Sequence, residues 1–210
     1  NVLETVTDTI LYGDSLIYTF TNPAVFSVTG ANQIKSFTSI AGDTIPANDT
    51  CYLTVFNYPF ISAFPYNQDF ETSNFFWTNG GSGSSWEWGA PADTIINLAA
   101  SGSKAWKTNL DGDYNTGELS WVESPCFDFS GLMKPVVNLS IWYETANGAY
   151  ARIQYSLNEG TTWQTVGAMG DSPNWYNSAN GWAGSSGTWI NARRTSPELA
   201  GLASVKFRLQ

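Results

Sequence analysis

The sequence contains no histidine, only two cysteines, and charged residues at just 13% of its 210 positions. Without histidine, the chain lacks the most frequent catalytic base and metal ligand, and serine–histidine or cysteine–histidine catalytic pairs are excluded. Two cysteines are too few for a scaffold built on disulfides. No apolar run approaches the roughly 20 residues that cross a bilayer, so we expect no membrane insertion.

The few basic residues argue against nucleic acid as a partner. Lysine and arginine number nine against 18 acidic residues, which gives a formal charge of −9, and only Arg193 and Arg194 are adjacent. Binding to phosphates requires clustered positive charge. An acidic surface is typical of an exported protein and is compatible with bound calcium. No leader segment stands at the start, so we expect any export signal to lie upstream or to have been removed.

Hydrophobic residues make up 42% of the chain and aromatic residues 15%, enough for a sizeable core. No segment sustains the i, i+3, i+4, i+7 spacing of an amphipathic helix, whereas glycine, serine, threonine and asparagine are frequent. The sequence therefore predicts an all-β fold with long polar loops.

Three runs rich in β-branched and aromatic residues open the chain, at 15–26, 31–43 and 49–57, and predict strands of a small sandwich. Together with Gly13-Asp14-Ser15, Gly42-Asp43 and Pro46 to Thr50, this pattern resembles the C-terminal half of the Ig-like, CARDB-type repeats of type IX-secreted bacterial surface proteins. The resemblance covers residues 1–57 and implies a sandwich whose first strands are missing. Residues 58–67, with two prolines and no charge, are expected to form a packed, stiff interdomain linker.

Residues 68–210 resemble a bacterial MAM-like domain. The matching elements are Asp69-Phe70-Glu71, Trp86 to Gly89, Ser124 to Asp128, Trp142-Tyr143 and a hairpin at 156–163. The resemblance implies a MAM/concanavalin-like jelly roll, an adhesive or accessory module, which in the family continues into one more strand with an acidic pair. The fold class expected for the whole chain is thus two tandem β-sandwiches, each incomplete at one end.

Alternation in the sequence supports strands within this second domain. Val137, Leu139, Ile141 and Tyr143 would share one face, with polar residues between them. The inward set of the next run would be Ala149, Ala151, Ile153 and Tyr155. We expect these two runs to pair as antiparallel strands around Asn147-Gly148.

The segment with Ser156, Asn158, Gly160 and Trp163 fits the Asp-box of sialidase-type propellers, with asparagine in the aspartate place. Sialidase chemistry would require several such boxes and an arginine cluster, but the chain has one box and four arginines. The structural interpretation is a tight hairpin in which Asn158 caps backbone amides while Trp163 packs beneath. We favour the hairpin.

Five glutamates, at positions 71, 87, 118, 123 and 144, leave open a carboxylate pair of the glycosidase type. The acids lie mainly in loops, and no strand carries alternating acids. We therefore expect no catalytic residues and no enzyme activity.

The loop Asn109 to Asn115 places oxygen donors at alternate positions, as calcium prefers. The MAM-like resemblance implies that Glu71 would join Asp111 or Asp113 around a structural Ca²⁺, with backbone carbonyls completing the shell. Asn109 of the same loop is a further candidate ligand. The alternative is a solvated polar turn.

A long loop carries four aromatic residues, Trp175, Tyr176, Trp182 and Trp189. Exposed rings of this kind stack on sugars, so the loop is a candidate carbohydrate site. The alternative, which we favour, is that these rings anchor the loop on the core.

Two further features concern covalent chemistry. Cys51 and Cys126 could form a disulfide or remain two buried thiols. Four Asp-Ser/Thr-aliphatic triplets resemble the O-glycosylation motif of the same bacterial group, with acceptors Thr9, Ser15, Thr44 and Thr94.

These features predict a non-catalytic adhesive or structural module of a large secreted protein at a bacterial cell surface. Its expected partners are surface glycans or proteins and neighbouring domains of the same polypeptide. The alternatives are a carbohydrate-binding accessory module of a secreted hydrolase or peptidase, and a catalytic jelly roll.

Overall fold

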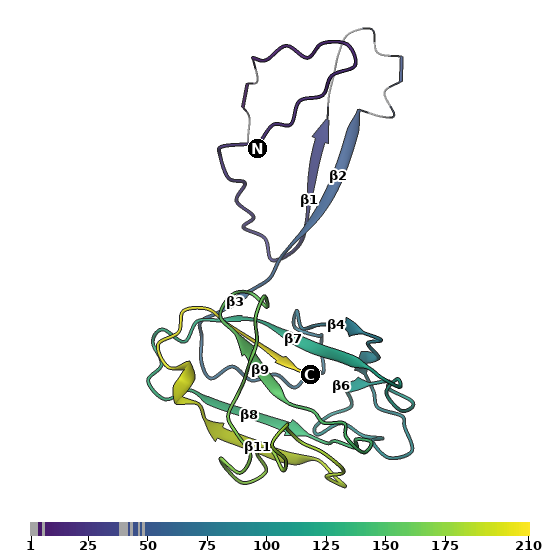
Figure 1. Cartoon of the computed structure of the whole chain (residues 1–210), viewed down its shortest axis with the longest axis vertical. Helices are drawn as coiled ribbons and strands as arrows, with labels where there is room; N and C mark the ends of the chain where they lie inside the picture. Colours follow the sequence, from purple (N-terminus) through teal and green to yellow (C-terminus); the bar gives the residue numbers. More distant parts are fainter. Residues whose placement is uncertain (1–3, 6, 38–41, 43, 46, 48) are drawn as a thin grey trace. The chain divides into compact units, whose positions relative to one another are not determined.

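The computed structural model describes residues 4–5, 7–37, 42, 44–45, 47 and 49–210. The chain divides into two compact units, unit 1 (Asn1–Asn57) and unit 2 (Tyr58–Gln210). Figure 1 shows strands and loops in both units, and unit 2 contains a 3-10 turn at Pro197–Leu199. The prediction of an all-β fold is confirmed. No helix in the described part has the length and apolarity to span a membrane.

Unit 1 contains one antiparallel hairpin among its described residues. Strand β1 (Gly30–Phe37) pairs with β2 (Thr50–Asn57) along their full lengths. β1 overlaps the second predicted run, and β2 falls within the third. The first run, 15–26, forms no strand, and this prediction was wrong. A strand needs a neighbour for its backbone groups, and the apolar side chains of this run, such as Ile17, are exposed. Asp43, Pro46 and Asn48 of the CARDB-type pattern lie outside the described residues.

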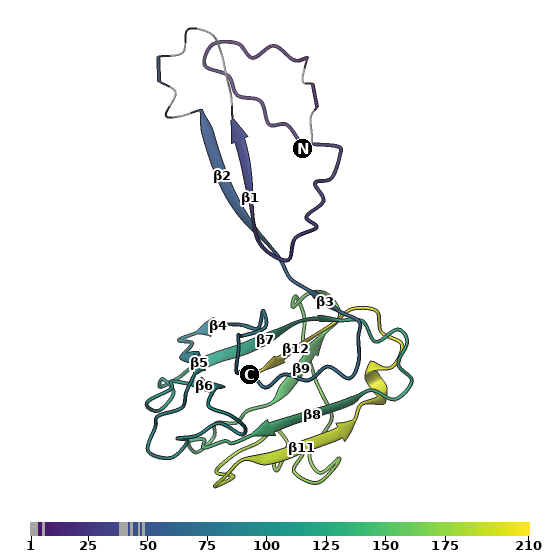
Figure 2. The ribbon, with the colours of Figure 1, turned by 180° about the vertical axis from the view of Figure 1, so that it is seen from behind.

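Unit 2 contains ten strands. They are β3 (Phe60–Ile61), β4 (Thr78–Ser82), β5 (Trp86–Gly89), β6 (Ala105–Thr108), β7 (Leu119–Phe127), β8 (Val136–Ile141), β9 (Ile153–Ser156), β10 (Gln164–Thr165), β11 (Ile190–Thr195) and β12 (Val205–Leu209). The large sheet has the order β10-β9-β12-β7-β3, and β4 also pairs with β7. Two further sheets, β11-β8 and β5-β6, have two strands each (Figure 2).

The core of unit 2 is formed by side chains that these sheets turn toward one another. It includes Phe127 of β7, Ile141 of β8, Ala192 of β11 and Val205 of β12. Along β8, apolar residues alternate with exposed ones, which confirms the predicted strand and its inward face.

The predicted pairing of β8 with β9 was wrong. β8 pairs with β11, whereas β9 lies between β10 and β12 in the other sheet. The chain does turn near Asn147-Gly148, where the amide of Ala149 donates to the carbonyl of Ala146, but this turn leads from one sheet to the other. β9 is buried on both faces, polar Gln154 and Ser156 included. Alternation alone does not identify the partner strand.

The expected linker 58–67 is grouped with unit 2, and its expected packing is observed. β3 pairs in parallel with β7, with Phe60 opposite Cys126. The rings of Tyr66 and Phe127 make an edge-to-face contact with centroids 5.0 Å apart. The aromatic residues that distinguish this stretch from a flexible linker are there because they pack on the core.

Candidate functional site

The aromatic loop of unit 2 is held in the core. Trp175, Tyr176 and Trp182 are 1%, 3% and 1% exposed. Their rings pack on one another, with the centroids of Tyr176 and Trp182 4.7 Å apart in an edge-to-face arrangement. A sugar stacks on an exposed ring face, which these three residues do not offer. The carbohydrate-site prediction is therefore wrong for them, and they anchor the loop.

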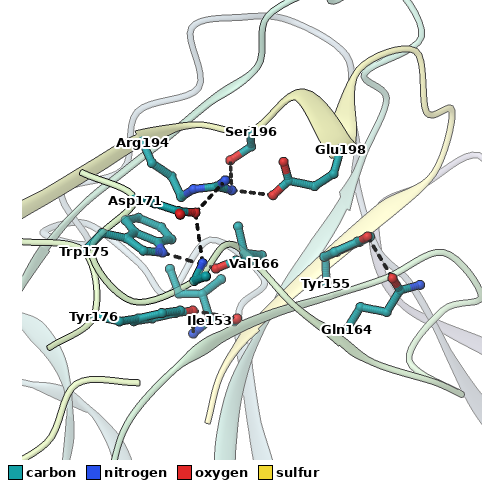
Figure 3. Close-up of polar contacts among 11 residues, drawn as sticks. Ile153, Tyr155, Gln164, Val166, Asp171, Trp175, Tyr176, Arg194, Ser196 and Glu198 are labelled. Atoms are coloured by element: carbon teal, nitrogen blue, oxygen red, sulfur yellow. Dashed lines mark hydrogen bonds and ion pairs between the residues drawn. The ribbon is translucent and has the colours of Figure 1, made fainter. Parts of the chain in front are cut away.

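Polar bonds fix the same rings to the neighbouring backbone (Figure 3). The hydroxyl of Tyr176 donates to the carbonyl of Ile153 and accepts from its amide, both at 3.0 Å. The indole nitrogen of Trp175 donates to the carbonyl oxygen of Val166 at 3.2 Å. Burial raises the pKa of Tyr176 to about 12. These bonds satisfy the polar atoms that burial of the rings removes from water.

Arg194 covers this ring cluster with its guanidinium group. It pairs with Asp171 at 3.0 Å and with Glu198, and its carbon Cζ lies 5.6 Å from the centroid of Trp175 (Figure 3). Gly167 allows this approach, because a Cβ atom there would lie 2.6 Å from the Nε atom of Arg194. Arg194 is thus bound within the protein. The sequence showed only an arginine pair, since Asp171 and Trp175 come from a separate segment.

Trp189, the fourth predicted ring, contacts other residues. It is half-buried, its indole nitrogen donates to the carbonyl oxygen of Leu98 at 2.9 Å, and its ring packs against Trp142 with centroids 6.2 Å apart. The four predicted aromatic residues do not all join one cluster.

The Asp-box segment forms the hairpin that joins β9 to β10, and the structural interpretation is confirmed. The side-chain oxygen of Asn158 accepts from the amide of Thr162 at 2.8 Å, and the hydroxyl of Ser156 accepts from the amide of Gly160 at 2.8 Å. Gly160 has φ +96°, and a Cβ there would lie 3.2 Å from Trp163. Side chains thereby replace the backbone partners that the turn lacks.

Trp163 also takes part in an aromatic stack on the large sheet. The guanidinium of Arg208 lies between two indoles, 4.4 Å from the centroid of Trp163 and 4.8 Å from that of Trp121. Burial lowers the pKa of Arg208. This stack was not foreseen, because alternation gives the face of a residue and not its neighbours on other strands.

The carboxylate of Glu71, expected to bind calcium, accepts hydrogen bonds from the chain. The amides of Ser103 and Lys104 donate to it at 3.0 Å and 2.8 Å, and the Ser103 hydroxyl at 3.0 Å. The amide of Lys104 and then that of Ser103 lower the pKa of Glu71, since both bonds favour the charged form.

In the acidic loop, carbonyl oxygens surround an ammonium group. Lys107 donates to the carbonyls of Thr108, Asn109 and Gly112, and pairs with Asp93 at 3.4 Å. The described residues contain no group of three or more aspartate, glutamate or cysteine side chains placed to hold a metal ion. Asp111 and Asp113 are exposed. The donor set therefore fits an ammonium better than the calcium ion expected from the sequence, and calcium binding stays a prediction.

Four of the five glutamates considered for catalysis have internal partners, and the fifth, Glu144, is exposed. Glu87 accepts from the amide of Leu110 at 2.8 Å, and Glu123 pairs with Lys206 at 2.6 Å. Glu118 accepts from the amide and hydroxyl of Ser85 and from Ser120. Burial alone would raise the pKa of Glu118, but these bonds outweigh it and lower the pKa.

Cys51 of unit 1 and Cys126 of unit 2 are free thiols in the structure, and a disulfide between them stays a prediction. Cys51 is exposed and Cys126 is half-buried, so the alternative prediction of two buried thiols was wrong. The four residues proposed as glycan acceptors, Thr9, Ser15, Thr44 and Thr94, are exposed, as such modification requires. Their glycosylation stays a prediction.

No family model and no solved structure matches the chain. A stretch of 85 residues, 40% of the chain, is 41% identical to bacillopeptidase F of Bacillus subtilis (strain 168). The matched part amounts to 6% of that protein's length. Its name describes a peptidase, and the similarity concerns one small part of it.

Proposed function

We propose that this chain is a non-catalytic adhesive or structural module of a large secreted protein at a bacterial cell surface. Its partners in this proposal are surface glycans or proteins and neighbouring domains of the same polypeptide. Unit 1 would belong to an Ig-like, CARDB-type sandwich, and unit 2 would be a MAM-like jelly roll.

One observation carries this proposal: four of the five glutamates considered for acid–base chemistry, Glu71, Glu87, Glu118 and Glu123, are bound by the protein's own groups. Glu71 and Glu118 each accept several hydrogen bonds, and Glu123 pairs with a lysine. In the described part, every carboxyl group with a shifted pKa is shifted downward (Glu4, Glu71, Asp93, Glu118 and Asp128). A general acid at neutral pH needs a raised pKa, so these groups suit a structural role.

A second candidate is an accessory module of a secreted peptidase, with no active site of its own. The 85-residue similarity to bacillopeptidase F favours it. Both candidates require a binding surface and no chemistry, and they differ in what the remainder of the polypeptide does.

Binding measurements on the purified chain test the proposal. We expect saturable binding to at least one glycan or surface protein on arrays of bacterial and host surface components. Trp175→Ala should lower stability and leave binding by the remaining folded protein unchanged, because the ring is buried. Absence of any binding would contradict the adhesive proposal. To examine the second candidate, the chain is fused to a peptidase catalytic domain. If the chain is an accessory module, the fusion should cleave an insoluble protein substrate faster than the catalytic domain alone does, and a soluble substrate at the same rate.

A further inference from the structure

The large sheet of unit 2 has a polar face that points away from the core. Ile153 and Tyr155 of β9 and Val205 of β12 belong to the core. Side chains alternate between the two faces of a strand, so Gln154 and Arg208 point to the opposite face. There the Nε atom of Arg208 donates to the side-chain oxygen of Gln154 at 2.7 Å. We call the surface around this contact the outer face, and its side chains are Trp121, Glu123, Arg152, Gln154, Lys206, Arg208 and Gln210.

Two arginines of the outer face, Arg152 and Arg208, form no ion pair with any of the described residues. Arg152 donates from Nε and Nη2 to the side-chain oxygen of Gln210 at 3.1 Å and 2.9 Å, and this acceptor is neutral, like that of Gln154. The Nη1 atom of Arg152 and both Nη atoms of Arg208 donate to no acceptor in the part of the chain that the structure describes. These guanidinium donors are available to a ligand.

Basic side chains outnumber acidic ones on the outer face, although the whole chain has a formal charge of −9. Arg152, Lys206 and Arg208 are positive, whereas Glu123 is negative. The carboxylate of Glu123 is bound by Lys206 at 2.6 Å. Arg208 lies opposite Gln154, which makes Arg152 its diagonal neighbour, about 7–8 Å away. Burial lowers the pKa of Arg208, Glu123 opposes this, and the charge of Arg152 lowers it further. An anion that contacts both arginines would relieve their repulsion.

Aromatic rings hold both guanidinium groups in place. That of Arg208 lies between the indoles of Trp121 and Trp163. The Cζ atom of Arg152 lies 5.3 Å from the centroid of the Tyr150 ring. Groups that are fixed before binding lose little freedom when a ligand binds. Contacts within the protein therefore arrange the two guanidinium groups for an anion.

The surroundings of the two arginines favour a sugar as the carrier of this anion. Tyr150 is 38% exposed, so its ring offers a surface on which a sugar can stack, in contrast to the buried Trp175. A peptide could not pair as a strand here, because β9 lies between β10 and β12, and β12 lies between β9 and β7 (Figure 2). The planar guanidinium fork binds oxygen atoms of acidic groups through parallel hydrogen bonds.

We propose that the outer face binds an acidic polysaccharide. A sugar ring stacks on Tyr150, and a carboxylate or sulfate group of the polysaccharide accepts hydrogen bonds from Arg152 and Arg208. This site rests on the proposed function, in which surface glycans are partners, and adds the class of glycan and the residues that bind it. Physiological salt screens charges beyond about 8 Å, so the charge of the outer face selects the ligand despite the acidity of the chain.

Isothermal titration of the purified chain with defined oligosaccharides tests this site. The acidic probes are a hexamer of galacturonic acid and sulfated maltohexaose, and their neutral counterparts are the methyl ester of the first and unmodified maltohexaose. We expect saturable binding of at least one acidic probe, and its neutral counterpart should bind roughly tenfold more weakly or worse. The tighter of the two acidic probes identifies the acidic group. Equal binding by the neutral counterpart or by hexaglutamate, or no saturable binding of either acidic probe, overturns the proposal.

Two variants locate the binding site. Arg152→Gln removes a charge and should weaken binding of the acidic probe roughly tenfold. Tyr150→Ala removes the exposed ring and should weaken it roughly fivefold. The matched control Arg193→Gln removes a positive charge at an exposed position of β11, outside the outer face, and should leave binding unchanged. Melting temperatures establish that each variant is folded. Equal weakening by the control, or none by either Arg152→Gln or Tyr150→Ala, overturns the proposal.

Arrays of bacterial and host surface components separate failure of this site from failure of the adhesive function. If the chain binds a neutral glycan or a protein on the arrays, and neither Arg152→Gln nor Tyr150→Ala changes that binding, the acidic-polysaccharide site is wrong and the adhesive function stands. If the chain binds nothing on the arrays and neither acidic probe, both proposals are wrong.

Discussion

The ammonium nitrogen of Lys107 lies 2.8 Å from the carbonyl oxygen of Gly112, inside the loop that the sequence marks as a calcium site. With only 8% of its side chain exposed, Lys107 brings its own positive charge to these carbonyl oxygens. Asp93, with 12% of its side chain exposed, balances that charge. Burial of a charge requires such partners, and here they fix the turn after β6.

Replacing Lys107 by methionine should therefore lower the free energy of unfolding of unit 2. The change leaves Asp93 and three carbonyl oxygens without their cation, and loss of one partner of a buried pair costs about 3–5 kcal/mol. Urea unfolding followed by tryptophan fluorescence measures this, because all ten tryptophans lie in unit 2. Lys134→Met, at an exposed position, is the control and should change stability little.

Chelation is the corresponding test for calcium. Because Lys107 satisfies the carbonyl oxygens of Asn109 and Gly112, we expect EDTA to leave the melting temperature of unit 2 unchanged. Added calcium should also have no effect, since a ligand raises the melting temperature only when it binds the folded state. If chelation lowers the melting temperature by several degrees and added calcium reverses this, the result would support the calcium site expected around Glu71 and Asp111.

Tyr176→Phe should destabilise unit 2 by about 1–3 kcal/mol. The hydroxyl removed is buried and bonds both backbone groups of Ile153, which would remain without this partner. Tyr150→Phe provides the control, because Tyr150 is 38% exposed. If both variants unfold at the same urea concentration, the Tyr176 bonds do not stabilise the loop.

The stability of unit 2 should depend on Glu118 in acid. Its pKa is lower in the folded state than the ordinary value of 4.5, so the unfolded state binds more protons in the window between the two values. The stability that Glu118 contributes is present above pH 4.5 and is lost as the pH falls through the folded pKa. Glu118→Gln should cost about 2 kcal/mol at neutral pH and give a flatter profile below pH 4.5. An unchanged slope in this range would show that other carboxylates dominate.

Asn158 offers a test of the hairpin. Asn158→Ala removes the acceptor for the Thr162 amide and should cost about 1 kcal/mol. Asn158→Asp keeps that acceptor and should retain most of the stability. The expected order of melting temperatures is wild type, then Asp, then Ala, and equal destabilisation by the two variants would argue against amide capping.

Sequence patterns predicted local structure better than long-range pairing. Strands β2 and β8 follow from alternation and β-branched composition, and the hairpin at Asn158 follows from side chains that bond within five residues. The partner of β8 could not be predicted, because β11 lies about 50 residues further along the chain and shares no pattern with it.

The candidate site was predicted only as far as residue type allows. The sequence identified the aromatic loop, but the burial of Trp175 depends on Arg194 and Val166, which come from other segments. The acidic loop resembled a calcium site because oxygen donors show in the sequence, whereas the return of the Lys107 side chain onto the loop's carbonyl groups does not. Similar donor sets bind a metal or an ammonium, and three-dimensional arrangement decides between them.

Hydrolysis by the purified chain tests the central claim most directly, namely that these carboxylates and rings hold the fold and perform no chemistry. The chain is incubated with panels of polysaccharide and peptide substrates, and released sugar ends and amines are measured against buffer. The account predicts no release above the buffer rate. Measurable turnover would contradict the account if a single substitution such as Glu118→Gln or Glu71→Gln abolishes it in a variant that remains folded.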